Sequence, residues 1–312
     1  MAGVCDNIDI DVTCSIPAPI LQSHMRLLVT ADLHFNHPRS RPLAEQLIER
    51  INAQGGDVLL VIGDAAAADG DDLERCLERF RFSGPRLFVA GNHELWTTRE
   101  DSYHIFTDEL PSRVQSLGWQ WLQTAPFVDG DVAILGSIGW YDYSFAPASL
   151  SIPRRFYERK ISPGAAERFP SQYADLLAHS DDIPPAAGQV LARWNDGKFV
   201  KLHRSDVAFL DELLEQMRRQ LSSVAALRHI VAAVHHLPFR ELLPPARGMQ
   251  WDFAKAYLGS PRIGELLMQH ANVRHVFCGH SHFPAEARLG NICAINIGSG
   301  YRYKTFRVLD IE

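Results

Sequence analysis

The sequence contains few cysteines, and none of them are spaced as a pair. The five cysteines stand at positions 5, 14, 76, 278 and 293. An odd number without paired spacing argues against a disulfide framework and against a zinc ribbon. Because proteins with few disulfides are typical of reducing compartments, we expect a cytoplasmic protein.

Two further absences narrow the class of protein. No apolar run is long enough to span a bilayer, so we expect no membrane partner. There is also no excess of basic residues, since the net charge is -6. Proteins that bind nucleic acid usually carry a basic surface, so this balance argues against a nucleic-acid partner. It does not argue against a small anionic substrate, because bound metal cations would supply local positive charge.

The chain is long enough for a sizeable core, but its first segment differs from the rest. Of the 312 residues, residues 1–24 contain early acids and later prolines, with no basic region leading into an apolar stretch. A secretory signal peptide is therefore not supported. We expect residues 1–24 to be a disordered leader or a tag-like segment, with Ser23-His24-Met25 as a possible cloning junction. Residues 25–312 are expected to form a single domain.

The first third of the chain alternates between apolar runs and amphipathic stretches. We expect buried strands at residues 26–30, 58–62 and 86–90. One helix begins at Pro42 and ends before Gly55, and another lies between the second and third strands. Strand, helix, strand, helix, strand is typical of right-handed βαβ units with parallel strands.

The remainder of the chain contains several further regular elements and one irregular region. Helices are expected at 103–117, from the cap Ser205 to 221, and at 263–270; strands at 127–128, 132–135, 229–234, 275–278, 285–289, 292–297 and 303–310. The last three strands are expected to lie in a second, partly antiparallel sheet. Prolines interrupt residues 141–203, which are too long for an ordinary loop, so we expect an inserted cap beside the functional site.

Polar side chains follow five of the predicted strands at the point where each strand ends. The five motifs are Asp32-Leu33-His34, Gly63-Asp64, Gly91-Asn92-His93-Glu94, His235-His236 and Gly279-His280-Ser281-His282. Open α/β sheets place their chemistry in the crevice at the carboxyl ends of their strands. Carboxylate, amide and imidazole donors suit manganese, iron or zinc. The set contains no cysteine, which disfavours a structural zinc centre.

Each of these motifs has a commonplace explanation when it is taken alone. An Asp-x-His in a loop is more often structural than a metal ligand. A Gly-Asp is usually only a turn, and a histidine at a strand end is often a satisfied buried group. Five such motifs in order, each after an apolar strand, favour two metal ions held between the strand ends.

Together the five motifs resemble those of the calcineurin-like metallophosphoesterases. The blocks of that family are Asp-x-His, Gly-Asp, Gly-Asn-His-Asp/Glu, a single His and Gly-His-x-His, and here they span residues 32–282. The resemblance implies an α/β fold, a four-layer αββα sandwich of two mixed sheets flanked by helices, with the cap inserted. It also implies an enzyme, a metal-dependent phosphoric ester hydrolase.

The resemblance further implies a role for each matched residue. The ligands of one metal would be Asp32, His34, Asp64 and His282, and those of the other would be Asp64 as a bridge, Asn92, His235 and His280. His93 would contact the substrate phosphate without binding metal and would act as the general acid. The alternative for His93 is a histidine that only orients the ligands. We expect His236 to be a structural neighbour of His235.

The expected chemistry follows from the two cations. They lower the pKa of a bridging water, so a metal-bound hydroxide can attack a phosphoester near neutral pH. His93 would protonate the departing oxygen. We expect a small phosphodiester or phosphomonoester as substrate, with the diester favoured slightly. The alternative is a non-catalytic metal-binding scaffold or interaction protein of the same fold, against which the complete ligand set argues.

The branch within the family and the substrate contacts are less well defined by the sequence. Residues 65–69 do not match the Val-Asp-Arg-Gly pattern of protein phosphatases, and His34 and Ala67 replace the Gly and Tyr of purple acid phosphatases. Trp140 and Tyr141 are expected to bind substrate by stacking on a flat leaving group, with packing inside the cap as the alternative. The sequence leaves the oligomeric state open.

Overall fold

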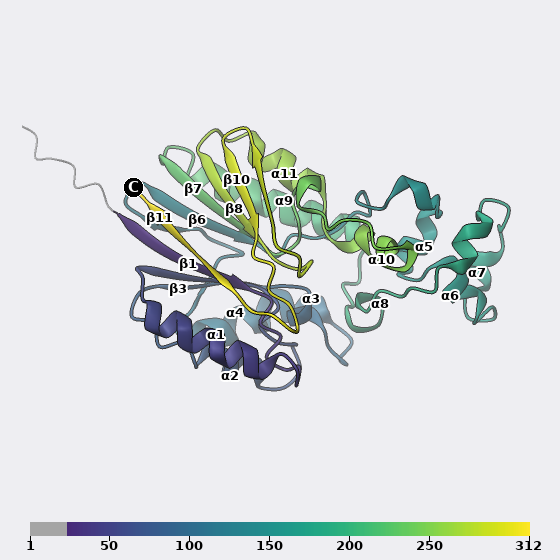
Figure 1. The fold of residues 1–312 in the computed structure, drawn as a ribbon, viewed down its shortest axis with the longest axis horizontal. Helices are drawn as coiled ribbons and strands as arrows, with labels where there is room; N and C mark the ends of the chain where they lie inside the picture. Colours follow the sequence, from purple (N-terminus) through teal and green to yellow (C-terminus); the bar gives the residue numbers. More distant parts are fainter. Residues whose placement is uncertain (1–23) are drawn as a thin grey trace, which may run out of the picture.

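The computed structural model describes residues 24–312, so the leader expected at residues 1–24 lies outside the described residues except for His24. Two β-sheets stack face to face, and helices cover their outer sides (Figure 1). The strand orders are β11-β1-β2-β3-β4 and β5-β6-β7-β8-β10-β9. Apolar side chains such as Leu60 and Ile134 fill the space between the sheets. The predicted four-layer α/β architecture is therefore confirmed.

The first sheet is built from the predicted βαβ units. Its first four strands are β1 Met25–Ala31, β2 Val58–Ile62, β3 Arg86–Val89 and β4 Gln120–Trp121, all parallel. Helices α1 Arg41–Gln54 and α2 Asp72–Leu77 connect the first three strands and lie outside the sheet (Figure 1). Because these strands run in the same direction, the polar residues that follow them meet at one edge of the sheet.

The helix expected at 103–117 is present but widened in its middle. Its three parts are α3 Ser102–His104, the π-helical turn η2 Ile105–Glu109 and α4 Leu110–Ser116. Pro111, the second residue of α4, has no backbone N–H to donate to the preceding turn. The missing α-helical hydrogen bond explains why the π turn forms just before this proline.

The second sheet combines a hairpin with parallel strands. Its strands are β5 Phe127–Asp129, β6 Val132–Ser137, β7 His229–Val234, β8 Val273–Cys278, β9 Ala285–Leu289 and β10 Ile292–Asn296. The predicted hairpin joins β5 to β6, and β6, β7, β8 and β10 are mutually parallel. Helices α9 Asp206–Ser223 and α11 Pro261–Met268 cover the outer side. The predicted N-cap of α9 is present, since Ser205 Oγ accepts a hydrogen bond from Ala208 N at 3.1 Å.

The expectation that all three strands of the last segment lie in the second sheet is wrong for β11 Phe306–Ile311. This strand pairs antiparallel with β1 in the first sheet, with Thr30 opposite Phe306 (Figure 1). Arg26 Nε and Asp310 Oδ1 form an ion pair across the two strands at 2.8 Å. Alternating apolar residues predict a strand but not its partner, whereas the open edge of β1 requires one.

Between β6 and α9 the chain forms a lobe of short helices that projects beside the strand ends (Figure 1). The lobe comprises η3 Ala148–Leu150, α5 Arg154–Glu158, α6 Pro163–Glu167, α7 Ala174–Leu177, η4 Pro185–Gln189 and α8 Asp196–Phe199. After β7 the chain forms η5 Arg240–Leu242, α10 Met249–Ala254 and η6 Lys255–Tyr257, and α10 packs beside the lobe. None of the helices in the described part of the chain is both long and apolar enough for a membrane span.

Candidate metal centre

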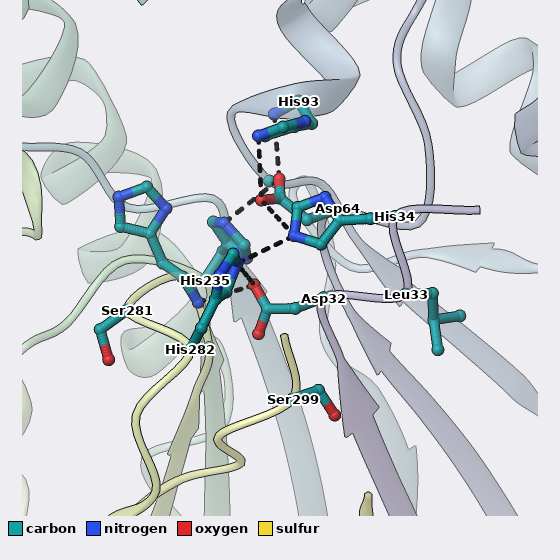
Figure 2. A network of polar contacts seen from close by, with 12 residues as sticks. Asp32, Leu33, His34, Asp64, His93, His235, Ser281, His282 and Ser299 are labelled. Atoms are coloured by element: carbon teal, nitrogen blue, oxygen red, sulfur yellow. Dashed lines mark hydrogen bonds and ion pairs between the residues drawn. The ribbon is translucent and has the colours of Figure 1, made fainter. Parts of the chain in front are cut away.

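The polar motifs after β1, β2, β3, β7 and β8 meet at one end of the two sheets, and Figure 2 shows part of this cluster. The side chains form two groups, Asp32, His34, Asp64 and His282 in one and Asp64, His235 and His280 in the other. Within each group the candidate ligand atoms all lie within 4.8 Å of one another. Asp64 belongs to both groups, which is the placement expected of a bridging carboxylate.

The two oxygens of Asp64 face different histidines (Figure 2). His235 Nε2 lies 3.3 Å from Oδ1, whereas His34 Nε2 lies 3.7 Å from Oδ2. Burial alone would raise the pKa of Asp64, but His93 and His235 outweigh it and lower the pKa well below its usual value. The carboxylate is therefore a fixed negative charge between the two groups.

The histidines present nitrogen lone pairs that nothing else in the described chain satisfies. His235 Nδ1 contacts the Ile62 carbonyl at 3.0 Å, and His280 Nε2 contacts the Tyr257 carbonyl at 3.2 Å. Because a carbonyl only accepts, these nitrogens carry a hydrogen, and the opposite nitrogens are the ones that can bind a cation. Against the effect of burial, Asp64 raises the pKa of His235 to about 9, so a cation there would displace a proton. Those opposite nitrogens, His235 Nε2 and His280 Nδ1, are buried without a partner, as is Asn92 Oδ1.

These atoms fit two cations. Buried polar atoms are nearly always hydrogen-bonded, so three unpartnered atoms beside Asp64 are suited to binding a cation. In the other group His34 Nε2 and His282 Nε2 face each other at 2.9 Å, an arrangement that a cation between two lone pairs would explain. The mixture of carboxylate, amide and imidazole donors suits manganese, iron or zinc.

The backbone at the candidate ligands adopts an uncommon conformation. Five of them have a positive φ: Asp32 at 55°, His34 at 44°, Asp64 at 52°, His280 at 67° and His282 at 55°. Non-glycine residues rarely adopt this left-handed conformation, which costs roughly 1–3 kcal/mol each and gathers at functional sites. The conformation turns each side chain into the space between the strand ends.

Glu94, which the sequence left almost unexplained, holds the loops that carry the centre. Its buried carboxylate accepts hydrogen bonds from the backbone N–H groups of Asp64 at 2.8 Å, Ala65 at 2.6 Å, Ala66 at 3.1 Å and Gly91 at 2.6 Å. Burial and the nearby Asp64 raise the pKa of Glu94 to about 7, against the effect of these hydrogen bonds. The loops after β2 and β3 are thereby fixed to each other.

His93 lies at the edge of the cluster without belonging to either group of ligands. It begins the short turn η1 His93–Leu95, and its side chain stacks on Trp96 with ring centroids 3.7 Å apart. Its Nε2 is 3.8 Å from Asp64 Oδ2. Only 8% of the residue is exposed, and that part faces the cavity beside the cluster.

The cavity beside the cluster has a volume of about 260 Å³. Asp64, Asn92, His93, His280 and His282 form its floor, and the aromatic residues Trp96, Trp194, Trp251 and Tyr301 contribute to its walls. Arg193 of the lobe is the cation among its lining residues. The tryptophans and Arg193 were not predicted. The run Trp194-Asn195-Asp196 within the proline-rich region was the available signal for them.

The structure disagrees with the expectation that Trp140 and Tyr141 contact substrate. Both side chains are fully buried and neither lines the cavity. Trp140 Nε1 donates to Asp206 at 2.8 Å, and the Tyr141 hydroxyl donates to Asp196 at 3.0 Å. The chain turns inward after β6 at Gly139, with φ of 58°, so these rings pack beneath the lobe instead of facing the cavity.

His236 lies beside the centre but in neither group of ligands. Its Nδ1 contacts the Ile138 carbonyl at 3.0 Å, and its ring packs against that of His280 with centroids 4.2 Å apart. Burial lowers its pKa to about 3, so the ring is neutral near pH 7. Its placement agrees with the expected structural role.

The fold, the five motifs and the candidate centre match one family of proteins. The model of the calcineurin-like phosphoesterases matches residues 25–284. The chain belongs to the calcineurin-like phosphoesterase family. These proteins are metal-dependent phosphoesterases that normally bind two metal ions, which agrees with the class of enzyme and cofactor predicted from the motifs.

Relatives within the family are similar over different lengths. The chain is 34% identical to the [acyl-carrier-protein] phosphodiesterase PptH of Mycobacterium tuberculosis over 132 residues, which are 39% of this chain and 39% of that protein. The crystal structure of phosphopantetheinyl hydrolase PptH from Mycobacterium tuberculosis matches with a TM-score of 0.63 and 20% identity, covering 88% of this chain and 89% of that chain. The sequence match therefore spans about two fifths of the relative, whereas the fold agrees over most of both chains.

Proposed function

We propose that the chain is a phosphodiesterase with a dinuclear metal centre. The shared placement of Asp64 in two groups of ligands, at the floor of a cavity that also exposes His93, carries this proposal. The proposed ligands of the first metal are Asp32, His34, Asp64 and His282; those of the second are Asp64, Asn92, His235 and His280. Two bound cations would neutralise the charge on the phosphate oxygens and acidify a water molecule near neutral pH.

Side chains and backbone carbonyls of the protein would hold the cations, orient the ligands and supply a proton. Asp64 holds a negative charge between the two cation positions, and the carbonyls of Ile62 and Tyr257 fix which nitrogens of His235 and His280 can bind. His93, which lines the cavity beside the proposed ligands, would donate a proton to the leaving oxygen. Burial lowers its pKa, but a phosphate anion in the cavity would raise the pKa and so favour the protonated acid.

The walls of the cavity favour a diester over a free phosphomonoester. A monoester carries one organic group and a diester carries two, and the several aromatic residues that line the cavity, among them Trp194, Trp251 and Tyr301, can contact more than one such group. We propose that the lobe over residues 141–203 acts as the expected cap, since Arg193 and Trp194 belong to it.

The similarity to PptH favours one diester over others as the first substrate to test. By its names that relative is a phosphodiesterase of acyl-carrier protein and a phosphopantetheinyl hydrolase. We therefore propose a phosphopantetheinyl diester on a carrier protein as the leading substrate. A free small-molecule diester is the second candidate, supported by the enclosed volume of about 260 Å³.

The test is a set of assays on protein reconstituted separately with manganese, iron, zinc and cobalt. We expect faster hydrolysis of bis(p-nitrophenyl) phosphate than of p-nitrophenyl phosphate, and release of phosphopantetheine from the modified carrier protein. Turnover of the diester without release from the carrier would favour a small-molecule substrate. No turnover of any ester with any metal would support the non-catalytic scaffold instead.

A further inference from the structure

A second buried carboxylate, Asp196 at the start of α8, reaches the metal centre from the lobe. No part of it is exposed. Its Oδ1 accepts hydrogen bonds from Asn92 Nδ2 at 2.9 Å and from Trp96 Nε1 at 2.7 Å. Its Oδ2 accepts from the Tyr141 hydroxyl at 3.0 Å and from Trp194 Nε1 at 2.7 Å. Among the described residues no cation pairs with this carboxylate, so its four partners are all neutral donors.

The first of these hydrogen bonds sets the orientation of the Asn92 amide. Nδ2 points to Asp196, which leaves Oδ1 as the free end of the amide, and Oδ1 is buried without a partner. An amide oxygen can bind a cation, whereas an amide NH₂ group only donates hydrogen bonds. A carboxylate that accepts from Nδ2 therefore holds Asn92 in the single orientation that suits a metal ligand.

The same oxygen also fixes the ring on which His93 rests. Trp96 donates its Nε1 proton to Asp196, and its ring stacks on that of His93 at an interplanar angle of 22°. The other oxygen holds Trp194, a wall of the cavity whose ring lies edge-on to His280 with centroids 5.9 Å apart. The side chain of Asp196 thus contacts the candidate ligand Asn92, the indole of Trp96 that stacks on His93, and Trp194 in the wall of the cavity.

We propose that Asp196 is a positioning residue through which the lobe completes the second cation position. It acts by orienting Asn92 and, through Trp96, by holding the imidazole of His93. The proposal rests on the proposed dinuclear centre, but its first readout is the binding of metal alone. It can therefore be tested even if no substrate is turned over.

Asparagine at position 196 cannot satisfy the four donors that aspartate satisfies. Each oxygen of Asp196 faces one indole N–H, of Trp96 or of Trp194, and an indole N–H only donates. Whichever way the new amide turns, its NH₂ group faces one of these indoles. If the NH₂ group replaces Oδ1, the Asn92 amide is favoured to turn over and to present its own NH₂ group to the cation position.

The chain provides a matched control in Asp206. This carboxylate is also buried, with 6% exposed, and accepts hydrogen bonds from Trp140, Tyr143 and Lys160. None of these three donors lines the metal cavity. Asp206→Asn therefore disturbs the packing beneath the lobe at least as much as Asp196→Asn does. It removes no hydrogen bond to Asn92 or Trp96.

The experiment is a calorimetric titration of metal-free protein with Mn²⁺, comparing wild type, Asp196→Asn and Asp206→Asn. We expect Asp196→Asn to keep the first cation and to bind the second roughly 10- to 100-fold more weakly, the usual effect of losing a group that orients a ligand. Asp206→Asn is expected to bind both as wild type does. Unchanged binding of both cations by Asp196→Asn, or an equal loss in the two variants, would overturn the proposal.

A second variant covers the case in which Asp196→Asn does not fold, as judged by circular dichroism. Asp196→Glu keeps the charge but displaces the carboxylate by one methylene, so we again expect selective weakening of the second cation. Wild-type binding of both cations by Asp196→Glu would count against the positioning role. If wild type binds two Mn²⁺ ions but hydrolyses no ester, the proposed activity fails while the role of Asp196 is still decided by the titration.

Discussion

Asp64 and Glu94 are neighbouring buried carboxylates whose surroundings give them opposite properties. Three histidines around Asp64 outweigh the effect of burial and lower its pKa. Around Glu94 burial is reinforced by the charge of Asp64, and the pKa rises to about 7. The first carboxylate is suited to attracting cations, whereas the second accepts hydrogen bonds from the backbone of the loops that carry the first. The same functional group is thus suited to binding a cation in one position and to supporting the loops in the other.

The proposed role of Asp64 as a bridging ligand leads to a direct prediction for Asp64→Asn. An amide offers one oxygen and no charge, so it cannot face His235 on one side and His34 on the other as the carboxylate does. We expect loss of both metals by elemental analysis and loss of diester hydrolysis. Asp69→Asn is the control, because Asp69 follows the same strand but contacts Thr97, Thr98 and Arg99 and belongs to neither group of ligands. Two retained metals with normal turnover in Asp64→Asn would exclude the bridge.

The proposed role of His93 as a general acid predicts that the effect of its loss depends on the leaving group. In His93→Ala we expect both metals to be retained, because His93 lies in neither group of ligands. Hydrolysis of esters with poor leaving groups should fall by about 100-fold or more, the usual contribution of a general acid, and p-nitrophenyl esters should be affected less. His37→Ala is a suitable control, since His37 packs on Tyr301 without lining the cavity. Equal losses for good and poor leaving groups would identify His93 as a residue that only orients ligands.

At the level of helices and strands, the positions of the ligands could be predicted because parallel strands end at the same edge of a sheet. Asp32, Asp64 and Asn92 each follow an apolar run, and the structure brings all three to one place. The left-handed backbone of Asp32 and Asp64 could not be predicted, because it is imposed by contacts with distant loops and not by local sequence. Glu94 shows the same limit, since its hydrogen-bond donors at Asp64 and Ala65 belong to another loop.

The walls of the cavity were harder to predict for a related reason. Trp140, which directly follows β6, is buried, whereas Trp194, which lies in a region without periodicity, faces the cavity. Aromatic residues favour burial in general, so composition alone does not separate the two cases. The distinction depends on where the lobe folds back toward the strand ends.

In the turn after β2, adding a single methyl group at Gly63 is expected to have a strong effect on metal binding and stability. Gly63 has φ of 66°, and a Cβ there would lie 2.5 Å from both Gly91 N and His235 Nδ1. We expect Gly63→Ala to lose metal as well as stability, measured by elemental analysis and thermal unfolding. Gly290→Ala is the matched control, because Gly290 has φ of 59° but no atom near its Cβ. In Gly290→Ala the strained backbone should lower the free energy of unfolding by only about 1–2 kcal/mol, and the variant should keep its metals.

For the whole molecule, the two sheets could be predicted from the resemblance to the family that the motifs carry. The sheet to which β11 belongs could not be predicted. The motifs lie on strands of both sheets, so the centre lies where the first sheet, the second sheet and the lobe meet. Removal of metal should therefore loosen contacts between these three parts more than contacts within each. The hydrogen bond between Asn92 and Asp196 connects the centre to the lobe, so the lobe should also be loosened.

Removal of the metals is expected to lower the stability of the folded chain and to loosen the regions around the centre. A cation that binds only the folded chain stabilises it by about 2.7 kcal/mol at a concentration of 100 times its dissociation constant. We expect a chelator to lower the melting temperature and to speed hydrogen exchange in the loops after β1 and β2 and in α8, with little change in the middle of α9. Asp64→Asn should show no metal-dependent shift. Uniform acceleration throughout the chain would contradict a local role for the centre.

The pairing of β11 with β1 has a consequence for how the protein is made. Residues 306–311 are synthesised after all the other described strands, yet they cover the edge of the strand that leads into Asp32. Lys304, just before them, donates a hydrogen bond to the Asp32 carbonyl. Until this segment emerges, the nascent chain has an open strand edge of the kind that recruits other chains. The first sheet can therefore close on this side only after residues 306–311 have been synthesised.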